Sequence, residues 1–146
     1  MIIDLSFLQA IFSFLIILTP IVFFHELGHF WVARRFGVNV EIFSIGFGPV
    51  LFSKTDNYGT AWQLAAIPIG GFVKMEGELN INPSRNKTLI KKGSFQFANV
   101  WQRSAIVFAG PFANVLLTIM IIASIYLFFG KVEIPNTINS IVSNSA

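Results

Sequence analysis

The chain has 146 residues, of which 54% are hydrophobic and only 12% are charged, whereas soluble domains typically carry about 25% charged residues. Its mean hydropathy is +0.69, and it contains no cysteine. The absence of cysteine excludes disulfides and thiolate metal ligands. This composition predicts a membrane protein, not a soluble globule, in which any metal ion is held by histidine, carboxylate or water.

The formal net charge of +3 is unevenly distributed along the chain. All lysines and arginines except Lys131 lie between Arg34 and Arg103, and this block is flanked by two apolar stretches without lysine or arginine, 5–33 and 104–130. Under the positive-inside rule, residues 36–103 are expected on the cytoplasmic side and both termini on the extracytoplasmic side. The same distribution argues against nucleic acid as a partner and in favour of the lipid bilayer.

Two long apolar segments are predicted to be transmembrane helices. The segment 5–33 contains only His25, Glu26 and His29 as ionisable residues, and the segment 104–130 contains none. Each is longer than the ~20 residues that a spanning helix requires. A chain with two such segments is predicted to be a membrane α-helical protein.

Between the two helices the hydrophobic pattern changes to a period of two. Val38, Val40 and Ile42 alternate with polar residues, 56–59 is a turn signal, and 62–67 is predicted to be a returning strand. These patterns predict a small membrane-associated antiparallel β-sheet of three or four strands. The predicted domains are a first transmembrane helix at 1–35, a β-sheet region at 36–79, a cytoplasmic linker with an amphipathic lead-in at 80–103, a second transmembrane helix at 104–130 and an extracytoplasmic tail at 131–146.

The first helix carries the motif His25-Glu26-Leu27-Gly28-His29. Residues four apart share one face of a helix, so both imidazoles can bind one Zn²⁺ ion, and Glu26 can accept a proton from a water molecule. Ionisable residues in a spanning helix are costly and usually functional. The motif therefore predicts His25 and His29 as metal ligands and Glu26 as the catalytic base. The alternative is a pair of structural histidines at the membrane interface.

A polar side chain in the second helix is predicted at a matching depth. At ~1.5 Å per residue, Asn114 lies about 16 Å inside the boundary marked by Arg103, and His25 lies roughly 13 Å inside the boundary marked by Arg34. We therefore expect Asn114 to face the zinc site and to bind the substrate backbone or the developing oxyanion. The alternative is a contact between helices, because membrane asparagines often serve that purpose.

The apolar sheet provides a third candidate feature. Gly46, Gly48, Gly70 and Gly71 permit close approach of another backbone. A substrate helix must become extended before cleavage, and pairing with a strand edge would hold it in that form. These glycines are therefore predicted to bind substrate. An ordinary cytoplasmic hairpin is the alternative.

Four stretches, HELGH, IGFGP, IPIGGFVKM and WQRSAIVFAGPFAN, together resemble the site-2 protease family, and most closely its bacterial regulator of sigma-E protease type. The resemblance covers roughly residues 15 to 130. It implies an inner-membrane enzyme with zinc as cofactor, His25 and His29 as ligands, Glu26 as general base and Asn114 in substrate positioning. It also implies a membrane-anchored protein substrate, for example an anti-sigma factor, that another protease cuts first.

The chain departs from this family pattern in one respect. The family takes a third zinc ligand from an aspartate in a later transmembrane helix, within an LDG-type motif, and no such motif occurs in the chain. The carboxylates outside the HExxH motif are not expected to face it; they are Asp4, Glu41, Asp56, Glu76, Glu78 and Glu133. We therefore expect the chain to be an N-terminal part whose remaining helices are supplied in cis or by another chain.

The predicted function is that of a zinc-dependent intramembrane endopeptidase. The main alternative is a non-catalytic pseudoprotease that binds membrane helices through the same groove. A membrane HExxH protease with a glutamate as third ligand is less consistent with the AGPFAN and GGFVKM stretches. A transporter is disfavoured because two helices with one polar cluster provide little of a pathway.

Overall fold

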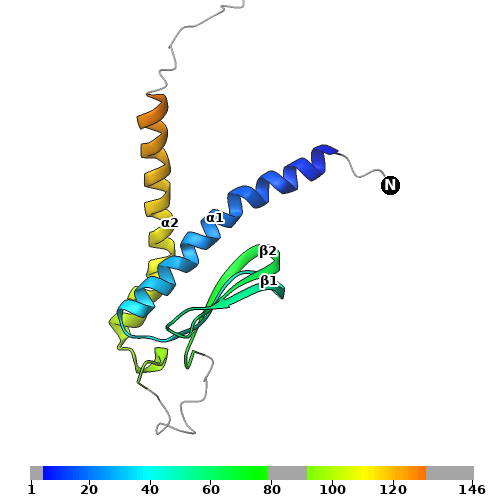
Figure 1. Cartoon of the computed structure of the whole chain (residues 1–146). Coiled ribbons are helices and arrows are strands. Elements are labelled where there is room, and N and C mark those ends of the chain that lie inside the picture. The colour runs from blue at the N-terminus through cyan, green and yellow to red at the C-terminus, as the bar shows by residue number, and fades with distance from the viewer. Residues whose placement is uncertain (1–4, 79–91, 131–146) are drawn as a thin grey trace, which may run out of the picture.

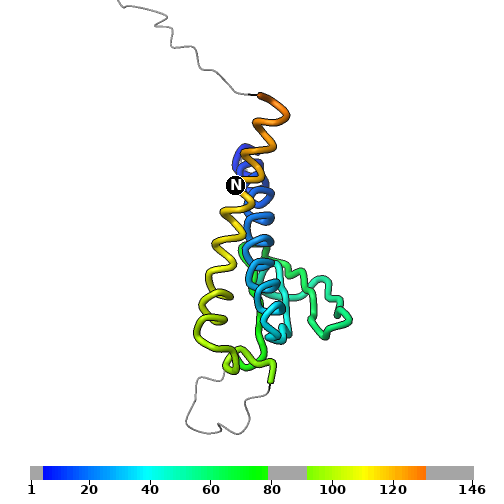
Figure 2. The backbone as a smooth tube through the Cα atoms, turned by 90° about the vertical axis from the view of Figure 1, so that its left-hand side faces the viewer, coloured from blue at the N-terminus to red at the C-terminus, as the bar shows by residue number. Residues whose placement is uncertain are grey.

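The computed structural model describes residues 5–78 and 92–130. The elements in chain order are α1 (Leu5–Arg35), β1 (Val40–Thr55), β2 (Ala61–Met75), the short 3₁₀ helix η2 (Phe95–Phe97) and α2 (Val100–Phe129). In two perpendicular views, α1 lies between α2 and the sheet (Figures 1 and 2). Along the chain, one long apolar helix thus precedes the sheet and another follows it, as predicted. The predicted linker residues 80–91 and the tail 131–146 lie outside the described residues.

Both helices are long and apolar enough to cross a membrane, judged by length and composition. The most hydrophobic window of each is not buried within the described part of the chain. α2 begins at Val100, before the segment predicted from Ser104, because a capping box starts the helix there. The Asn99 side chain accepts a hydrogen bond from the Gln102 amide at 2.9 Å, and the Gln102 side chain accepts one from the Asn99 amide at 3.0 Å. Each bond pairs an amide that the helix start leaves without a partner.

The C-terminus of α1 ends in a turn that depends on glycine. The amide of Gly37 donates to the Arg34 carbonyl at 3.0 Å, and the amide of Val38 donates to the Ala33 carbonyl at 2.9 Å. This pair of bonds is a Schellman motif, which requires a left-handed residue at its centre; Gly37 has φ 74°. The motif turns the chain sharply from α1 towards β1 and brings Val38 against Ala33 in the core.

The prediction of three or four separate strands is wrong, because the structure has two long strands. β1 and β2 pair antiparallel over 40–45 with 71–75 and over 50–55 with 61–65, but each strand bends, and the register shifts so that 42–45 also lie opposite 61–64, with residue numbers that rise together. Phe43 consequently lies opposite both Val73 and Trp62. Four paired segments result, in the order 50–55, 61–65, 40–45 and 71–75. The bend in β1 passes through Gly46 (φ 88°), where a Cβ atom would lie 2.7 Å from the Ile67 carbonyl oxygen.

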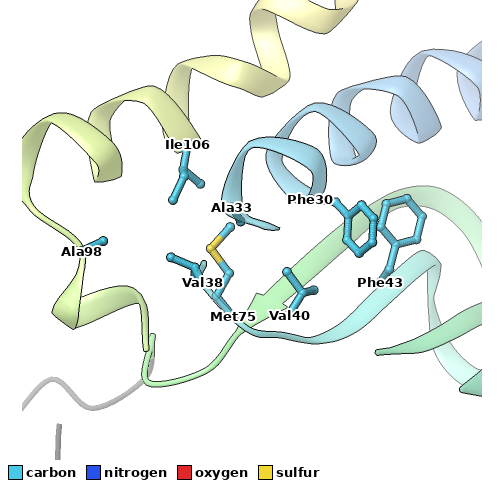
Figure 3. Packing of buried hydrophobic residues seen from close by; sticks show 8 residues of the cluster. All are labelled: Phe30, Ala33, Val38, Val40, Phe43, Met75, Ala98 and Ile106. Carbon is cyan, nitrogen blue, oxygen red and sulfur yellow. The ribbon is translucent and has the colours of Figure 1, made fainter. Parts of the chain in front are cut away.

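The core lies where the C-terminal end of α1 meets the sheet and the start of α2 (Figure 3). Phe30 packs edge-on against both Phe43 and Trp62, with ring centroids 5.5 and 4.9 Å apart. Ile106 of α2 is 1% exposed in the same cluster. The buried cluster consists of Phe30, Ala33, Val38, Val40, Phe43, Met75, Ala98 and Ile106. This cluster packs α1, the sheet and α2 against one another beside the HExxH motif.

A polar contact fastens the sheet to the end of α1. Arg34 donates to the Asp56 carboxylate at 2.7 Å and to the Thr60 hydroxyl at 2.9 Å. Asp56 also accepts from the Trp62 indole at 3.2 Å and from the Tyr58 and Thr60 amides at 2.9 and 3.0 Å. Desolvation acts to raise the pKa of Asp56, but the hydrogen bonds outweigh it and lower the pKa to about 2. The predicted turn at 56–59 is therefore present and is held by its own aspartate.

Candidate active site

His25 and His29 face each other from one side of α1. Their Nε2 atoms are 3.3 Å apart and their ring planes are nearly perpendicular, at 81°. Two nitrogens that each lie about 2.0–2.1 Å from one tetrahedral zinc ion would be about 3.3–3.4 Å apart. The Nε2 atoms therefore already have the spacing of two zinc ligands.

α2 determines the orientation of the two rings. The Nδ1 atom of His29 lies 2.7 Å from the Ile106 carbonyl oxygen. Because a carbonyl only accepts hydrogen bonds, Nδ1 of His29 carries the hydrogen and its Nε2 keeps a free lone pair. On the other ring, Nδ1 of His25 lies 3.2 Å from the Asn114 side-chain amide. Each histidine thus has its outer nitrogen against α2 and its inner nitrogen towards the other histidine.

Two glycines allow this close approach of α1 and α2. A Cβ atom on Gly110 would lie 2.6 Å from Cε1 of His29 and 2.9 Å from Nε2 of His25. A Cβ atom on Gly28 would collide with the Ala109 carbonyl group and lie 2.9 Å from the Ala113 methyl group. Sequence reasoning gave neither glycine a role. Their position inside predicted helices was the feature that could have indicated a role, because glycine inside a helix lowers its stability by roughly 0.5–1 kcal/mol relative to alanine.

The Glu26 side chain lies on the side of α1 that faces Gly71 of the sheet, and it borders two cavities. One cavity, of about 280 Å³, is lined by His25 and Glu26 together with Gly70, Gly71 and Asn114. The other, of about 270 Å³, is lined by Glu26, His29 and Gly71 as well as by apolar side chains. Glu26 and Gly71 therefore border both cavities, with the imidazole pair beside them.

The predicted substrate-binding residues do not all reach this place. Gly70, Gly71 and Asn114 line the cavity beside His25, whereas Gly46 and Gly48 lie at the bend of β1 and are not among its lining residues. Phe47, between them, does line it. The ring of Phe47 also packs against Gly70, where a Cβ atom would lie 2.5 Å from Cε2. The bend thus contributes to the cavity through its phenylalanine.

The described residues bring two histidines together, which is fewer than the set of ligands that a catalytic zinc site needs. No group of three or more metal-binding side chains comes together within 5–78 and 92–130, whereas catalytic zinc normally has three protein ligands. Glu41 pairs with Lys74, and Asp56 pairs with Arg34. Sequence reasoning did not place Glu78 near the motif, yet it lines the cavity of Glu26 and His29 and accepts from the Met75 amide at 3.2 Å.

Comparison with known proteins agrees with this geometry. The chain is 43% identical over 136 residues to a Rickettsia conorii protein whose name places it among zinc metalloproteases. It is 38% identical over 156 residues to the metalloprotease MmpA of Caulobacter vibrioides. It is also 41% identical over 142 residues to the regulator of sigma E protease of Haemophilus influenzae. These alignments cover 93%, 97% and 97% of the chain but only 38%, 39% and 31% of the relatives. The chain thus spans between about a third and two fifths of their length. The model of peptidase family M50 matches residues 13–145, and the chain accordingly belongs to peptidase family M50, the site-2 protease family that its four motifs indicated.

Proposed function

We propose that this chain forms part of a zinc-dependent intramembrane endopeptidase. The observation that carries the proposal is the 3.3 Å separation of the two Nε2 atoms in an HExxH motif, on a helix apolar enough to cross a membrane. Glu26 of the same motif borders the two cavities beside the histidines. Membership of family M50 supports the same reaction class.

His25 and His29 would hold the zinc ion through Nε2, and the third protein ligand would come from outside the described residues. When bound, zinc supplies Lewis-acid polarisation of a peptide carbonyl and activation of water for attack. Glu26 accepts a proton from the attacking water and returns it to the leaving amine, which is the role of a general base and then of a general acid. Its position next to the ligand His25 suits this transfer.

The edge of the sheet provides a means of binding an extended substrate. Segment 71–75 pairs with β1 on one side only in the described register, and its start at Gly70 and Gly71 lies beside Glu26 in the cavity. A substrate strand paired along this edge would bring its backbone to Glu26. We include Asn114 as a further substrate contact, because it lines the same cavity. Gly46 and Gly48 would act indirectly, by forming the bend that presents Phe47.

The exposed apolar surface of both helices suggests a location in the bacterial inner membrane. We place residues 36–103 on the cytoplasmic side, as their positive charge indicates. The relative named regulator of sigma E protease suggests a membrane-anchored substrate, such as an anti-sigma factor. The remaining helices, including the one with the third ligand, would be supplied in cis or by another chain.

Cleavage and zinc content together test the proposal. The native protein is purified in detergent and assayed on a membrane-anchored model substrate, alongside Glu26→Gln and the control Glu41→Gln, which changes a half-buried carboxylate paired with Lys74. We expect Glu26→Gln to abolish cleavage and to keep zinc, and the control to behave as wild type. Cleavage by Glu26→Gln would refute its role as base. A wild type that cleaves nothing, with or without bound zinc, would refute the proposal and favour the pseudoprotease.

A further inference from the structure

A further cavity lies at the C-terminal end of α1, beyond the HExxH motif. It has a volume of about 500 Å³, and no residue of the motif lines it. Its size falls in the range of about 300–1,000 Å³ that is usual for small-molecule sites. Its lining includes two arginines and no acidic residue, whereas both cavities beside the motif are lined by Glu26. The charge of this cavity therefore suits an anion.

Arg34, one of the two arginines, is held in place and still has donors to offer. Its guanidinium lies over the rings of Phe30 and Tyr58, 4.5 and 4.6 Å from their centroids. Its bonds to Asp56 and Thr60 both leave from Nη2. A guanidinium has five N–H donors, so these two bonds leave the three on Nη1 and Nε for another acceptor. Asp56 balances the charge of Arg34 but does not use up its donors.

Arg35, the second arginine, carries the unbalanced charge of the cavity. It is exposed and forms no ion pair within the described part of the chain. The C-terminal end of a helix normally disfavours an anion because its last carbonyl groups are free. Here the carbonyls of Val32, Ala33 and Arg34 accept from the amides of residues 36–38. Three of the last four carbonyls are thus occupied, and this repulsion is reduced.

Aromatic side chains place the cavity at the membrane surface. Trp31 and Tyr58 both line it and are 68% and 84% exposed, and exposed tryptophan and tyrosine are typical of the layer where lipid headgroups lie. Ile17 and Phe24 precede Trp31 at intervals of seven residues, so they lie on the same face of α1. The cavity therefore opens at headgroup level, with an apolar helix face beside it along which acyl chains would lie.

We propose that this cavity binds the phosphate group of an anionic phospholipid from the cytoplasmic leaflet. Arg35 and the remaining donors of Arg34 would bond the phosphate oxygens, which guanidinium groups bind through paired N–H donors. The cytoplasmic surface of a membrane is rich in such lipids. The inference rests on the proposed cytoplasmic placement of residues 36–103 and not on the zinc chemistry. Because Arg34 also bonds to Asp56 and Thr60, a bound lipid would hold the sheet at a fixed depth.

Lipid binding to the purified native protein in detergent tests the proposal. Native mass spectrometry counts the bound molecules of dioctanoyl phosphatidylglycerol and of dioctanoyl phosphatidylcholine, which has the same phosphate beside a compensating cation. We expect the phosphatidylglycerol to bind at least about fivefold more tightly, as ~1 kcal/mol per basic residue near the surface implies. Equal binding of the two lipids would overturn the proposal. Displacement by inorganic phosphate at the concentration of the lipid would assign the cavity to a soluble phosphate and overturn the lipid as its ligand.

Arginine variants show whether the binding takes place at this cavity. Arg35→Gln should weaken phosphatidylglycerol binding at least about fivefold, whereas Arg35→Lys keeps the charge and should retain most of the affinity. Arg103→Gln is the matched control, because Arg103 lies near the start of α2 and does not line the cavity. Unchanged binding in Arg35→Gln would overturn the proposal, as would an equal loss in Arg103→Gln. Unfolding midpoints equal to wild type would show that the variants are folded.

This inference and the proposed protease function fail in different ways, because lipid binding requires neither zinc nor cleavage. If the native protein cleaves its substrate but binds both lipids equally, the lipid site fails and the protease function stands. If it cleaves nothing but binds phosphatidylglycerol in a manner that depends on Arg35, the protease function fails and the lipid site stands.

Discussion

The contact between Gly110 and the histidine pair leads to a quantitative prediction for Gly110→Ala. Gly110 is buried on α2 and has no positive φ, so the helix backbone itself accepts alanine. The new methyl group would lie 2.6 Å from Cε1 of His29 and closer still to Nε2. Ordinary contact begins at 3.4 Å, so Cε1 must move by about 0.8 Å, the difference between these distances, or the helices must separate.

This displacement decides which property of the protein changes most. Metal–ligand distances are held within about ±0.2 Å, so a shift of about 0.8 Å is several times too large for the site. Stability is affected less, because overpacking costs about 1–3 kcal/mol while alanine gains roughly 0.8–1.0 kcal/mol over glycine in a helix. We therefore expect a net destabilisation of about 0–2 kcal/mol, together with a large loss of zinc binding.

Zinc content and unfolding of the purified native protein, measured in the same detergent, provide the assay. Ala123→Val is the matched control, because it adds two methyl groups to α2 at an exposed position. The control should keep its zinc, whereas Gly110→Ala should lose it at a zinc concentration that saturates wild type. A Gly110→Ala protein with wild-type zinc affinity would show that the rings do not depend on this gap.

Three further predictions concern the sheet and the orientation of the chain. Gly71→Ala should lower cleavage at least tenfold and leave the zinc content unchanged. The added Cβ would lie 2.7 Å from the Ser44 carbonyl oxygen and 3.2 Å from Cγ of Glu26. Loss of zinc in this variant would show that the sheet also holds the ligands. The chain has no cysteine, so single cysteines can report its topology. Cysteines placed at Ser6 and Phe129 should react with an impermeant maleimide on intact spheroplasts, whereas a cysteine at Asn57 should react only after lysis. The reverse labelling pattern would show that the topology is inverted. Asp56→Asn should remove an acid-sensitive part of the stability, because the pKa of Asp56 is about 2 in the fold against 3.8 ordinarily. A depressed carboxyl pKa stabilises the fold above about pH 4, and this effect is lost as pH falls towards 2. Unfolding midpoints measured between about pH 2 and 6 would show the loss, and an unchanged pH profile in Asp56→Asn would contradict the assignment.

Much of the fold was predictable because it depends on local patterns. The two apolar segments, the turn that begins at Asp56 and the alternating residues that follow Val38 each determine their structure from nearby neighbours. The number of strands was not predictable. Gly46 and the bend near Ile67 interrupt the hydrophobic pattern, yet the strands continue through them because the ladder re-forms in a shifted register. That register depends on contacts between residues distant in the sequence.

The arrangement of the candidate site was only partly predictable from the sequence. The HExxH spacing places both imidazoles on one face of α1, and the depth estimate placed Asn114 near His25, which the structure shows as a contact of 3.2 Å. The roles of Gly28 and Gly110 were not predictable, because nothing in a single helix shows which of its faces meets the other helix. The carbonyl of Ile106 carries no side-chain signal, so its bond to His29 could not be predicted from residue type.

These features together form one pattern spread over two antiparallel helices. Ile106, Gly110 and Asn114 are spaced four residues apart and so lie along one face of α2. Opposite them, His29 and His25 are also four residues apart. His29 contacts the Ile106 carbonyl, His25 contacts the Asn114 side chain, and Gly110 lies between these two contacts. The α1 motif therefore provides the nitrogens that would bind a metal ion, whereas the α2 stripe determines how both rings are turned. Because α2 already holds both rings, a third ligand would meet two nitrogens at the spacing of zinc ligands.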